Sequence, residues 1–285
     1  MDYQLGWSKN HPGHVVYLLD LSGSMENNGK IDRLITAVHD VVIDLIQDSA
    51  PSGVIEDNMT LTIIGYNSVV KTLVDNCTLS QLFDKMVNNG NKLLDKNADA
   101  KPQWQTFTAA GLREVAKEIR AWMDKQQKAN KAQPAPLVVH VTDGYPYEGE
   151  GTDESSFVNA LQAAEELKSI RTDDGNVRLF NIHIEPGMPT YTFPVSRPSG
   201  TNSQEKVMKF LFDSASVVDE GTKRNADLFL DPGMVKAGSR FMVSNVSGKG
   251  LLSKLIQFGS TPPSSLSPHP ANMVSINTAD SNSAV

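Results

Sequence analysis

The stretch from Val15 to Met25 constrains the fold of this chain more than any other feature of its sequence. It reads VVYLLDLSGSM, an apolar run followed by one carboxylate and two hydroxyls at alternate positions, Asp20, Ser22 and Ser24. A continuous apolar run of this kind is typical of a strand buried on both faces of a parallel sheet. Because open α/β sheets bind ligands at the carboxyl ends of their strands, we expect these side chains at a binding site.

The donor atoms of this motif favour a hard divalent cation. Asp20, Ser22 and Ser24 offer only oxygen ligands, which suit Mg²⁺ or Mn²⁺ better than zinc or copper. A plainer interpretation is that Asp20 caps the next helix and the serines lie in a turn, since Asp and Ser both favour such positions. The motif alone leaves both interpretations open.

Two later segments favour the metal site. LVVHVTDG, at 137–144, repeats the first design, an apolar strand that ends in a carboxylate, Asp143. PQWQTFTAAGL, at 102–112, leads into a predicted helix that either Thr106 or Thr108 could cap. The apolar residues of this helix fall on one face: they are Leu112, Val115, Ile119 and Trp122.

Together, the Asp-x-Ser-x-Ser run, the threonine before a helix and the second strand-end aspartate resemble the von Willebrand factor A (VWA) family and its metal-ion-dependent adhesion site. The resemblance spans roughly residues 12 to 258. Thr106 is preferred to Thr108 because the family's threonine is the first of a Thr-x-Thr pair, although Gln105 stands where the family usually has Gly. The matching metal-site positions are Asp20, Ser22, Ser24, Thr106 and Asp143.

The resemblance implies a mechanism and a setting. Ser22, Ser24 and Thr106 would contact Mg²⁺ (or Mn²⁺) directly. Asp20 and Asp143 would hold it directly or through water, which leaves one position open for a carboxylate of a partner protein. The implied function is a Mg-dependent protein–protein interaction module, an adaptor. Intracellular bacterial members work with ring-type ATPases or with kinase and phosphatase pairs in stress-response and phage-defence modules, including tellurite-resistance clusters.

The loop after the second aspartate, YPYEGEGTDE, could form part of the partner surface. Tyr145, Tyr147 and Glu148 are the predicted partner-binding residues, because exposed tyrosines favour interfaces. Alternatively, the loop is solvated, and Asp153 and Glu154 only begin the next helix and complement its dipole.

Enzymatic interpretations fit the sequence less well, and we predict that the protein is not an enzyme. A metal-dependent phosphohydrolase of the haloacid-dehalogenase type needs a second aspartate for acid–base chemistry, and Ser22 stands there. In a phosphate-binding loop the interval from Gly23 to Lys30 is one residue too long, and Ile31 replaces the required Ser or Thr. His140 and His183 lie inside apolar strands and are predicted to pack in the core.

Composition limits the protein's setting and partners. Its 285 residues, 39% of them apolar, can supply a sizeable core. A net charge of −7 argues against nucleic-acid binding, and no apolar segment is long enough for a membrane span. Residues 1–14 lack the features of a signal peptide, and the single cysteine, Cys77, fits a reducing compartment. We therefore predict a cytoplasmic protein; the competing hypothesis is an extracellular adhesin of the integrin-domain type.

The order of predicted elements indicates an α/β fold. Strands and helices alternate, which predicts a doubly wound, mostly parallel sheet with helices on both faces. Two adjacent strands, Met59–Ile64 and Val69–Val74, predict a hairpin and hence one antiparallel edge strand. Further helices are expected at Ile31–Gln47, Asp153–Ile170, Gln204–Phe212 and Gly250–Phe258, and further strands at Val177–Ile184 and Ala226–Leu230.

Three regions are predicted along the chain. Residues 1–13 form an N-terminal extension and residues 14–258 the VWA domain. Residues 259–285 form a tail rich in Ser, Pro and Asn with few large apolar residues. Such a composition cannot bury enough surface to fold, so the tail is predicted to be disordered.

Overall fold

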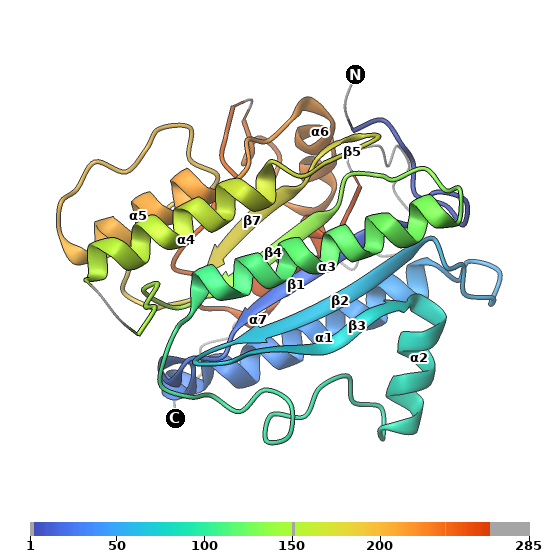
Figure 1. Ribbon diagram of the computed structural model, residues 1–285, viewed down its shortest axis with the longest axis horizontal. Helices are drawn as coiled ribbons and strands as arrows, with labels where there is room; N and C mark the ends of the chain where they lie inside the picture. The colour runs from blue at the N-terminus through green and yellow to red at the C-terminus, as the bar shows by residue number, and fades with distance from the viewer. Residues whose placement is uncertain (1–2, 150–151, 237, 263–285) are drawn as a thin grey trace, which may run out of the picture.

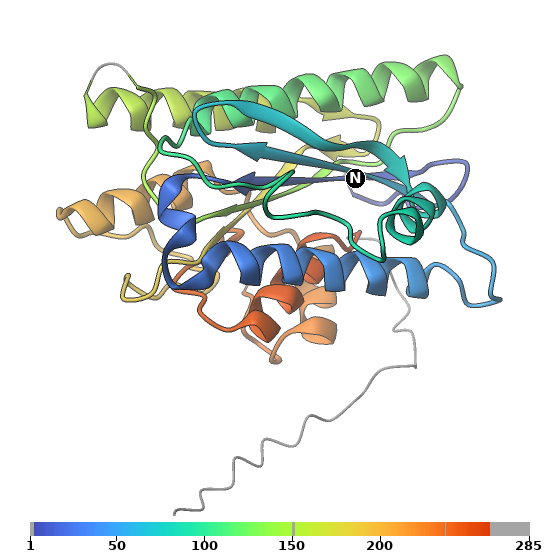
Figure 2. The same ribbon diagram turned by 90° about the horizontal axis from the view of Figure 1, so that it is seen from below.

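The computed structural model describes residues 3–149, 152–236 and 238–262. A six-stranded sheet forms its centre, in the order β3-β2-β1-β4-β7-β8. α3 and α4 cover one face of the sheet, and α1 and α7 cover the other (Figures 1 and 2). The main strands are β1 (Gly13–Asp20), β2 (Met59–Tyr66), β3 (Val70–Thr78), β4 (Leu137–Thr142), β7 (Arg178–His183) and β8 (Met242–Val243). The α-helices are α1 (Lys30–Asp48), α2 (Leu79–Asn88), α3 (Thr108–Lys128), α4 (Asp153–Lys168), α5 (Ser203–Ser214), α6 (Glu220–Phe229) and α7 (Lys249–Gly259).

The sheet confirms the predicted fold class. β1 pairs in parallel with β2 and β4, β4 with β7, and β7 with β8. Only β3, at one edge, runs antiparallel to its neighbour β2 among these strands of the described chain. The predicted hairpin and antiparallel edge strand are therefore both present.

The winding direction of the chain reverses between the two central strands. From β1 the chain passes through α1 to β2 and β3, and it then returns to the other side of β1 to form β4. α1, after β1, and α4, after β4, lie on opposite faces of the sheet (Figure 2). Loops that diverge in this way leave a crevice at the carboxyl ends of adjacent strands, which is where α/β sheets bind ligands.

Burial follows the periodicity of the sequence. Every residue of β1, β2 and β4 is buried, as expected for strands covered on both faces. On α3 the predicted face, Leu112 to Trp122, is buried against β1 and β2. Gly111 lets the helix approach closely, because a Cβ atom there would lie 3.1 Å from Tyr66 Cγ and 3.2 Å from Leu18 Cδ1.

The predicted strand at Ala226–Leu230 is wrong, because residues 226–229 belong to α6 and Leu230 directly follows its end. Asp219 caps that helix, and its Oδ1 accepts a hydrogen bond from Thr222 N at 3.0 Å. This cap, together with the burial of one face of the helix that includes Ala226, outweighs the strand propensity of a short apolar run. The last strand of the sheet is β8 instead. The short strands β5 (Arg171–Thr172) and β6 (Gly175–Asn176) form a separate two-stranded sheet that was not predicted.

The end of the described chain packs onto the first strand. α7 lies against α1, and Ser260 Oγ is 2.9 Å from the hydroxyl of the buried Tyr17. Most of the tail predicted to be disordered, residues 263–285, lies outside the described residues. Of the described helices, none combines the length and apolar character that a membrane span requires.

Candidate metal-binding site

Asp20, the last residue of β1, is fully buried and both of its carboxylate oxygens accept hydrogen bonds. Oδ1 accepts from Ser22 N at 2.8 Å, and Oδ2 accepts from Thr142 Oγ1 at 2.6 Å. Burial, together with the nearby charge of Asp143, raises the pKa of Asp20 to about 6. A raised pKa shows that negative charge at this position lacks full compensation within the protein.

Hydrogen bonds join the two predicted motifs into one cluster. Ser22 Oγ lies 3.0 Å from Ser24 Oγ, and Ser24 Oγ donates to Asp143 Oδ1 at 2.8 Å. Asp143 follows β4, whereas the serines follow β1, so the cluster lies where the winding direction reverses. Ser24 is exposed and the carboxylate of Asp143 is fully buried. The cluster therefore connects the interior to the surface.

Thr106 lies in the loop that runs between these two strand ends. Gln103, in the same loop, pairs with Ser22, and its N–H donates to Leu21 O at 2.9 Å. On the other side, Tyr147 N donates to Thr106 O at 2.9 Å. The Thr106 side chain is buried, and α3 begins two residues later. The structure thus places the loop of Thr106 beside both strand ends, while Thr108 is the first residue of the helix.

Lys30, the first residue of α1, is a charged member of the site that the sequence analysis did not identify. Its side chain is buried, and its Nζ lies 2.5 Å from Asp143 Oδ2. The same ammonium forms an ion pair with Glu185, which follows β7. Burial lowers the pKa of Lys30, but the hydrogen bonds to Asp143 and Glu185 outweigh it and the pKa is raised overall.

The residues present fit a hard divalent cation. Two buried carboxylates and the hydroxyls of the first motif converge at this edge of the sheet, and carboxylate and hydroxyl oxygens are ligands that Mg²⁺ and Mn²⁺ accept. Within the described residues, no group of three or more His, Cys, Asp and Glu side chains is arranged to hold a metal ion. A zinc-type donor set is thus absent from that part of the chain, and the site would depend on hydroxyl ligands.

The predicted partner-binding residues differ in their surroundings. Tyr145 packs edge-on against Phe157, with ring centroids 5.5 Å apart. Glu148 Oε1 accepts a hydrogen bond from Ala109 N at 2.9 Å, so this carboxylate caps the first turn of α3. Tyr147 is 42% exposed and remains available to a partner.

Trp104 is an exposed aromatic residue beside the site that the sequence analysis missed. It is 95% exposed, and its Cα lies 3.6 Å from the position that a Cβ on Gly23 would occupy. A large apolar residue within the polar stretch PQWQT, outside any periodic pattern, is the signal that could have identified it.

The strand histidines pack in the core as predicted. His140 Nε2 lies 2.7 Å from the Tyr66 hydroxyl, and Nδ1 lies 3.0 Å from Asn181 Oδ1. Burial lowers the pKa of His140 to about 4. For His183, burial and the charge of Lys30 lower the pKa to about 3. Both rings are therefore neutral near pH 7.

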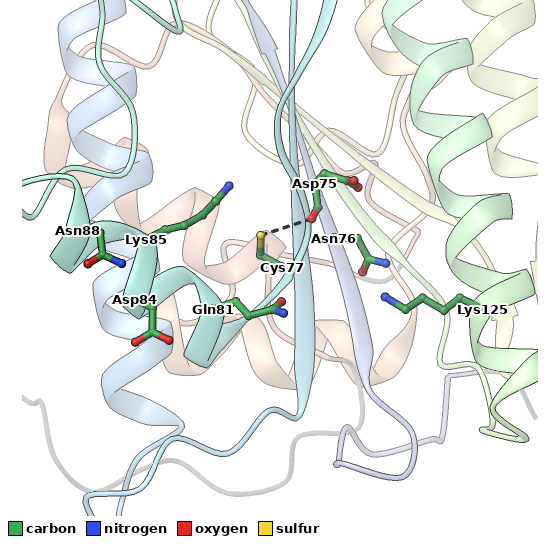
Figure 3. Close-up of a pocket in the computed structure, with 8 residues that line it drawn as sticks. All are labelled: Asp75, Asn76, Cys77, Gln81, Asp84, Lys85, Asn88 and Lys125. Atoms are coloured by element: carbon green, nitrogen blue, oxygen red, sulfur yellow. Dashed lines mark hydrogen bonds between the residues drawn. The ribbon is translucent and has the colours of Figure 1, made fainter.

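A hollow of about 530 Å³ lies apart from this cluster, between β3, α2 and α3. Figure 3 shows Lys125 extending from α3 toward Asn76, with the α2 side chains on the opposite side. Cys77, which is buried, lies on its floor and donates through Sγ to Asp75 O at 3.4 Å. None of the predicted metal-site residues lines this hollow.

Neither the protein-family models nor the curated proteins contain a match to this sequence. Solved structures do resemble it. The pilus adhesin SpaC from Lactobacillus rhamnosus GG, in an open conformation, has a TM-score of 0.54 and 15% identity over 90% of this chain. A D319A mutant of the PilB minor pilin from Streptococcus sanguinis has a TM-score of 0.52 and 15% identity over 89%.

The matched chains are longer than this one: it covers 31% of the SpaC chain and 62% of the PilB chain. A von Willebrand factor type A structure from Catenulispora acidiphila also matches, with a TM-score of 0.41 and 11% identity over 61% of this chain and 34% of its own. At these identities the matches to SpaC and PilB show a shared fold, and the third is too distant to support an argument.

Proposed function

We propose that this protein is a Mg²⁺- or Mn²⁺-dependent protein-interaction module of the VWA type, which binds an acidic residue of a partner. The observation that carries the proposal is the cluster of Asp20, Ser22, Ser24 and Asp143, joined by hydrogen bonds at the carboxyl ends of two central strands. The fold shared with a pilus adhesin and a minor pilin supports an interaction role.

In this proposal the hydroxyls of Ser22, Ser24 and Thr106 contact the metal directly. Asp20 and Asp143 hold it directly or through water. When bound, the ion supplies a positive charge with an open position, which a carboxylate of the partner can occupy. Trp104 and Tyr147, exposed beside the site, would then contact apolar groups that flank the partner's acidic residue.

Two settings remain in competition. The first is a cytoplasmic adaptor in a bacterial stress-response or phage-defence module, with a ring ATPase or a kinase and phosphatase pair as partner. The second is an extracellular adhesin, which the likeness to the pilus adhesin SpaC favours. Cys77 separates these two settings less well than the sequence suggested, because its thiol is buried and a buried free cysteine is tolerated in either compartment.

Thermal melts in chelator, Mg²⁺, Mn²⁺ and Ca²⁺ test the metal site. A ligand at 100 times its dissociation constant stabilises the native state by about 2.7 kcal/mol, so the midpoint of the wild type should rise by about 5–10 °C in Mg²⁺ or Mn²⁺. Ser24→Ala removes one proposed ligand and should abolish most of the rise. Ser52→Ala, exposed in the turn after α1, is the matched control and should keep it. A wild type whose midpoint neither Mg²⁺ nor Mn²⁺ raises would contradict the proposal.

Selection from a displayed peptide library tests the partner's chemistry. Peptides bound in Mg²⁺ and released by chelator should be enriched in Asp or Glu next to a large apolar residue. Trp104→Ser should weaken the selected peptides about tenfold, which corresponds to about 1.4 kcal/mol, without changing the melting midpoint. Selected peptides that lack an acidic residue would show that the partner does not bind through a metal-bound carboxylate.

A further inference from the structure

Lys30 places a second cation at the proposed metal site. Its ammonium lies 2.5 Å from Asp143 Oδ2, one of the two carboxylates that would hold the ion. Its side chain is 1% exposed, so water does little to screen this charge. Any divalent ion that uses Asp143 must share that carboxylate with Lys30 or displace it.

The charges around Asp143 explain why a cation is needed there. Asp20 and Asp143 are both buried, and the serines connect them: Ser22 N donates to Asp20 Oδ1, and Ser24 Oγ donates to Asp143 Oδ1. The ammonium of Lys30 lies 2.5 Å from Asp143 Oδ2 and brings a positive charge against this buried acidic pair.

Glu185 offers the ammonium a second position. It follows β7, is 33% exposed, and already forms an ion pair with Lys30. Lysine carries its charge on a flexible four-carbon chain, so its Nζ can move from Asp143 toward Glu185 without leaving a carboxylate partner.

We propose that Lys30 is a tethered counter-cation that competes with the metal for Asp143, stabilising the empty site and lowering its metal affinity, and that Glu185 retains the ammonium when the metal binds. The inference rests on the proposed function. It adds that the charge of Lys30 lowers the affinity of the site for the metal. The ion then binds weakly until a carboxylate of the partner adds negative charge.

Isothermal titration with MgCl₂ or MnCl₂ alone, on the full chain, gives the first readout. Lys30→Met keeps much of the aliphatic volume and removes the charge, and it should bind Mg²⁺ at least tenfold more tightly than the wild type. Lys96→Met is the matched control, because Lys96 also pairs with two carboxylates, Glu26 and Asp32, each at 3.1 Å, but does not contact Asp143. It should leave the affinity unchanged within about twofold.

The melting midpoint in chelator is a second readout, which involves no metal. Lys30→Met should lower it, because two buried carboxylates lose their counter-charge, and Mg²⁺ should restore more of the midpoint than it adds to the wild type. Glu185→Gln keeps Lys30 and changes a side chain that is only partly buried, so it tests the inference even if Lys30→Met fails to fold. It should bind Mg²⁺ several-fold more weakly, since the ammonium is left with Asp143 alone.

The outcomes separate this inference from the function on which it rests. If the wild type binds Mg²⁺ and neither variant changes its affinity in the expected direction, the counter-cation role is wrong and the metal site stands. If the wild type binds Mg²⁺ and Lys30→Met binds it at least tenfold more tightly, both are supported. If the wild type, Lys30→Met and Glu185→Gln all fail to bind Mg²⁺ and Mn²⁺, the metal site and the inference fall together.

Discussion

Asn181 joins two parts of the core through a buried polar chain, and its replacement should be costly. Its Oδ1 lies 3.0 Å from His140 Nδ1, and its Nδ2 donates to Leu211 O and Ser214 Oγ, each at 2.8 Å. Because Oδ1 can only accept, His140 carries its proton on Nδ1, and its Nε2 accepts from the Tyr66 hydroxyl. The chain of bonds thus runs from β2 through β4 and β7 to α5.

Asn181→Leu preserves the approximate size of the side chain and removes all three bonds. A typical bond contributes about 1 kcal/mol net, and a buried donor left unsatisfied costs about 1–3 kcal/mol. We expect the free energy of unfolding to fall by about 3–5 kcal/mol and the melting midpoint to fall by about 10 °C. Urea titration and thermal melts followed by circular dichroism measure both quantities.

Two further variants make this prediction specific. Asn88→Leu, an exposed asparagine at the end of α2, should change stability by less than about 0.5 kcal/mol. Combining Asn181→Leu with His140→Phe removes both partners of one bond, so the double variant should lose at least about 1 kcal/mol less than the two single losses added together. A loss below 1 kcal/mol for Asn181→Leu, or strict additivity in the double variant, would refute the reasoning.

Three other perturbations address the core and the rim of the site. Burial lowers the pKa of His14 to about 3, whereas the unfolded chain takes up this proton near pH 6.5, so stability should fall as the pH drops from 6.5 toward 3. Urea titrations at pH 4–6 give the slope of the free energy of unfolding against pH, and His14→Phe should reduce this slope by about 1.4 kcal/mol per pH unit. An unchanged slope would show that this histidine is not neutral in the folded protein. Gly111→Val should lower the free energy of unfolding by about 1–3 kcal/mol in the same assay, because the new side chain would overlap Tyr66. Gly250→Ala in α7 is the control and should be neutral or stabilising, because nothing lies within 4 Å of the added Cβ. Equal effects of the two variants would exclude the close approach at Gly111. Glu148→Ala should lower the free energy of unfolding by about 1 kcal/mol, because it removes the acceptor that caps α3. Glu148→Gln should cost much less, because its amide oxygen can still accept the bond. Equal losses for the two variants would show that the charge of Glu148 matters instead of the hydrogen bond.

The central strands and the helices that cover them could be predicted because their signals are local. β1 and β4 are mostly apolar strands. β1 ends at Asp20 and β4 ends at Thr142, the residue before Asp143, and both ends can be identified within ten residues of sequence. The parallel pairing of β1 and β4 then brings their carboxyl ends together, which neither short motif predicts by itself. α3 was predictable for the same reason, since its buried face repeats at helical spacing.

The features that were missed depend on contacts between distant segments. Lys30 becomes part of the site only because α1 begins beside residues that follow β4 and β7. The segment at 226–230 is apolar enough for a strand, and the cap at Asp219 decides that it is a helix. Glu148 looked like a surface carboxylate until the fold placed it at the first turn of α3.

The packing of α7 has a consequence for folding during synthesis on the ribosome. The first strand of the chain enters the centre of the sheet, but the helix that packs on α1 and the hydroxyl that bonds Tyr17 belong to residues 249–260. At about 5–20 residues per second of synthesis, the nascent chain waits on the order of ten seconds or more with this apolar surface uncovered. Chaperone binding during translation should therefore be concentrated on the first half of the chain and end once α7 has emerged.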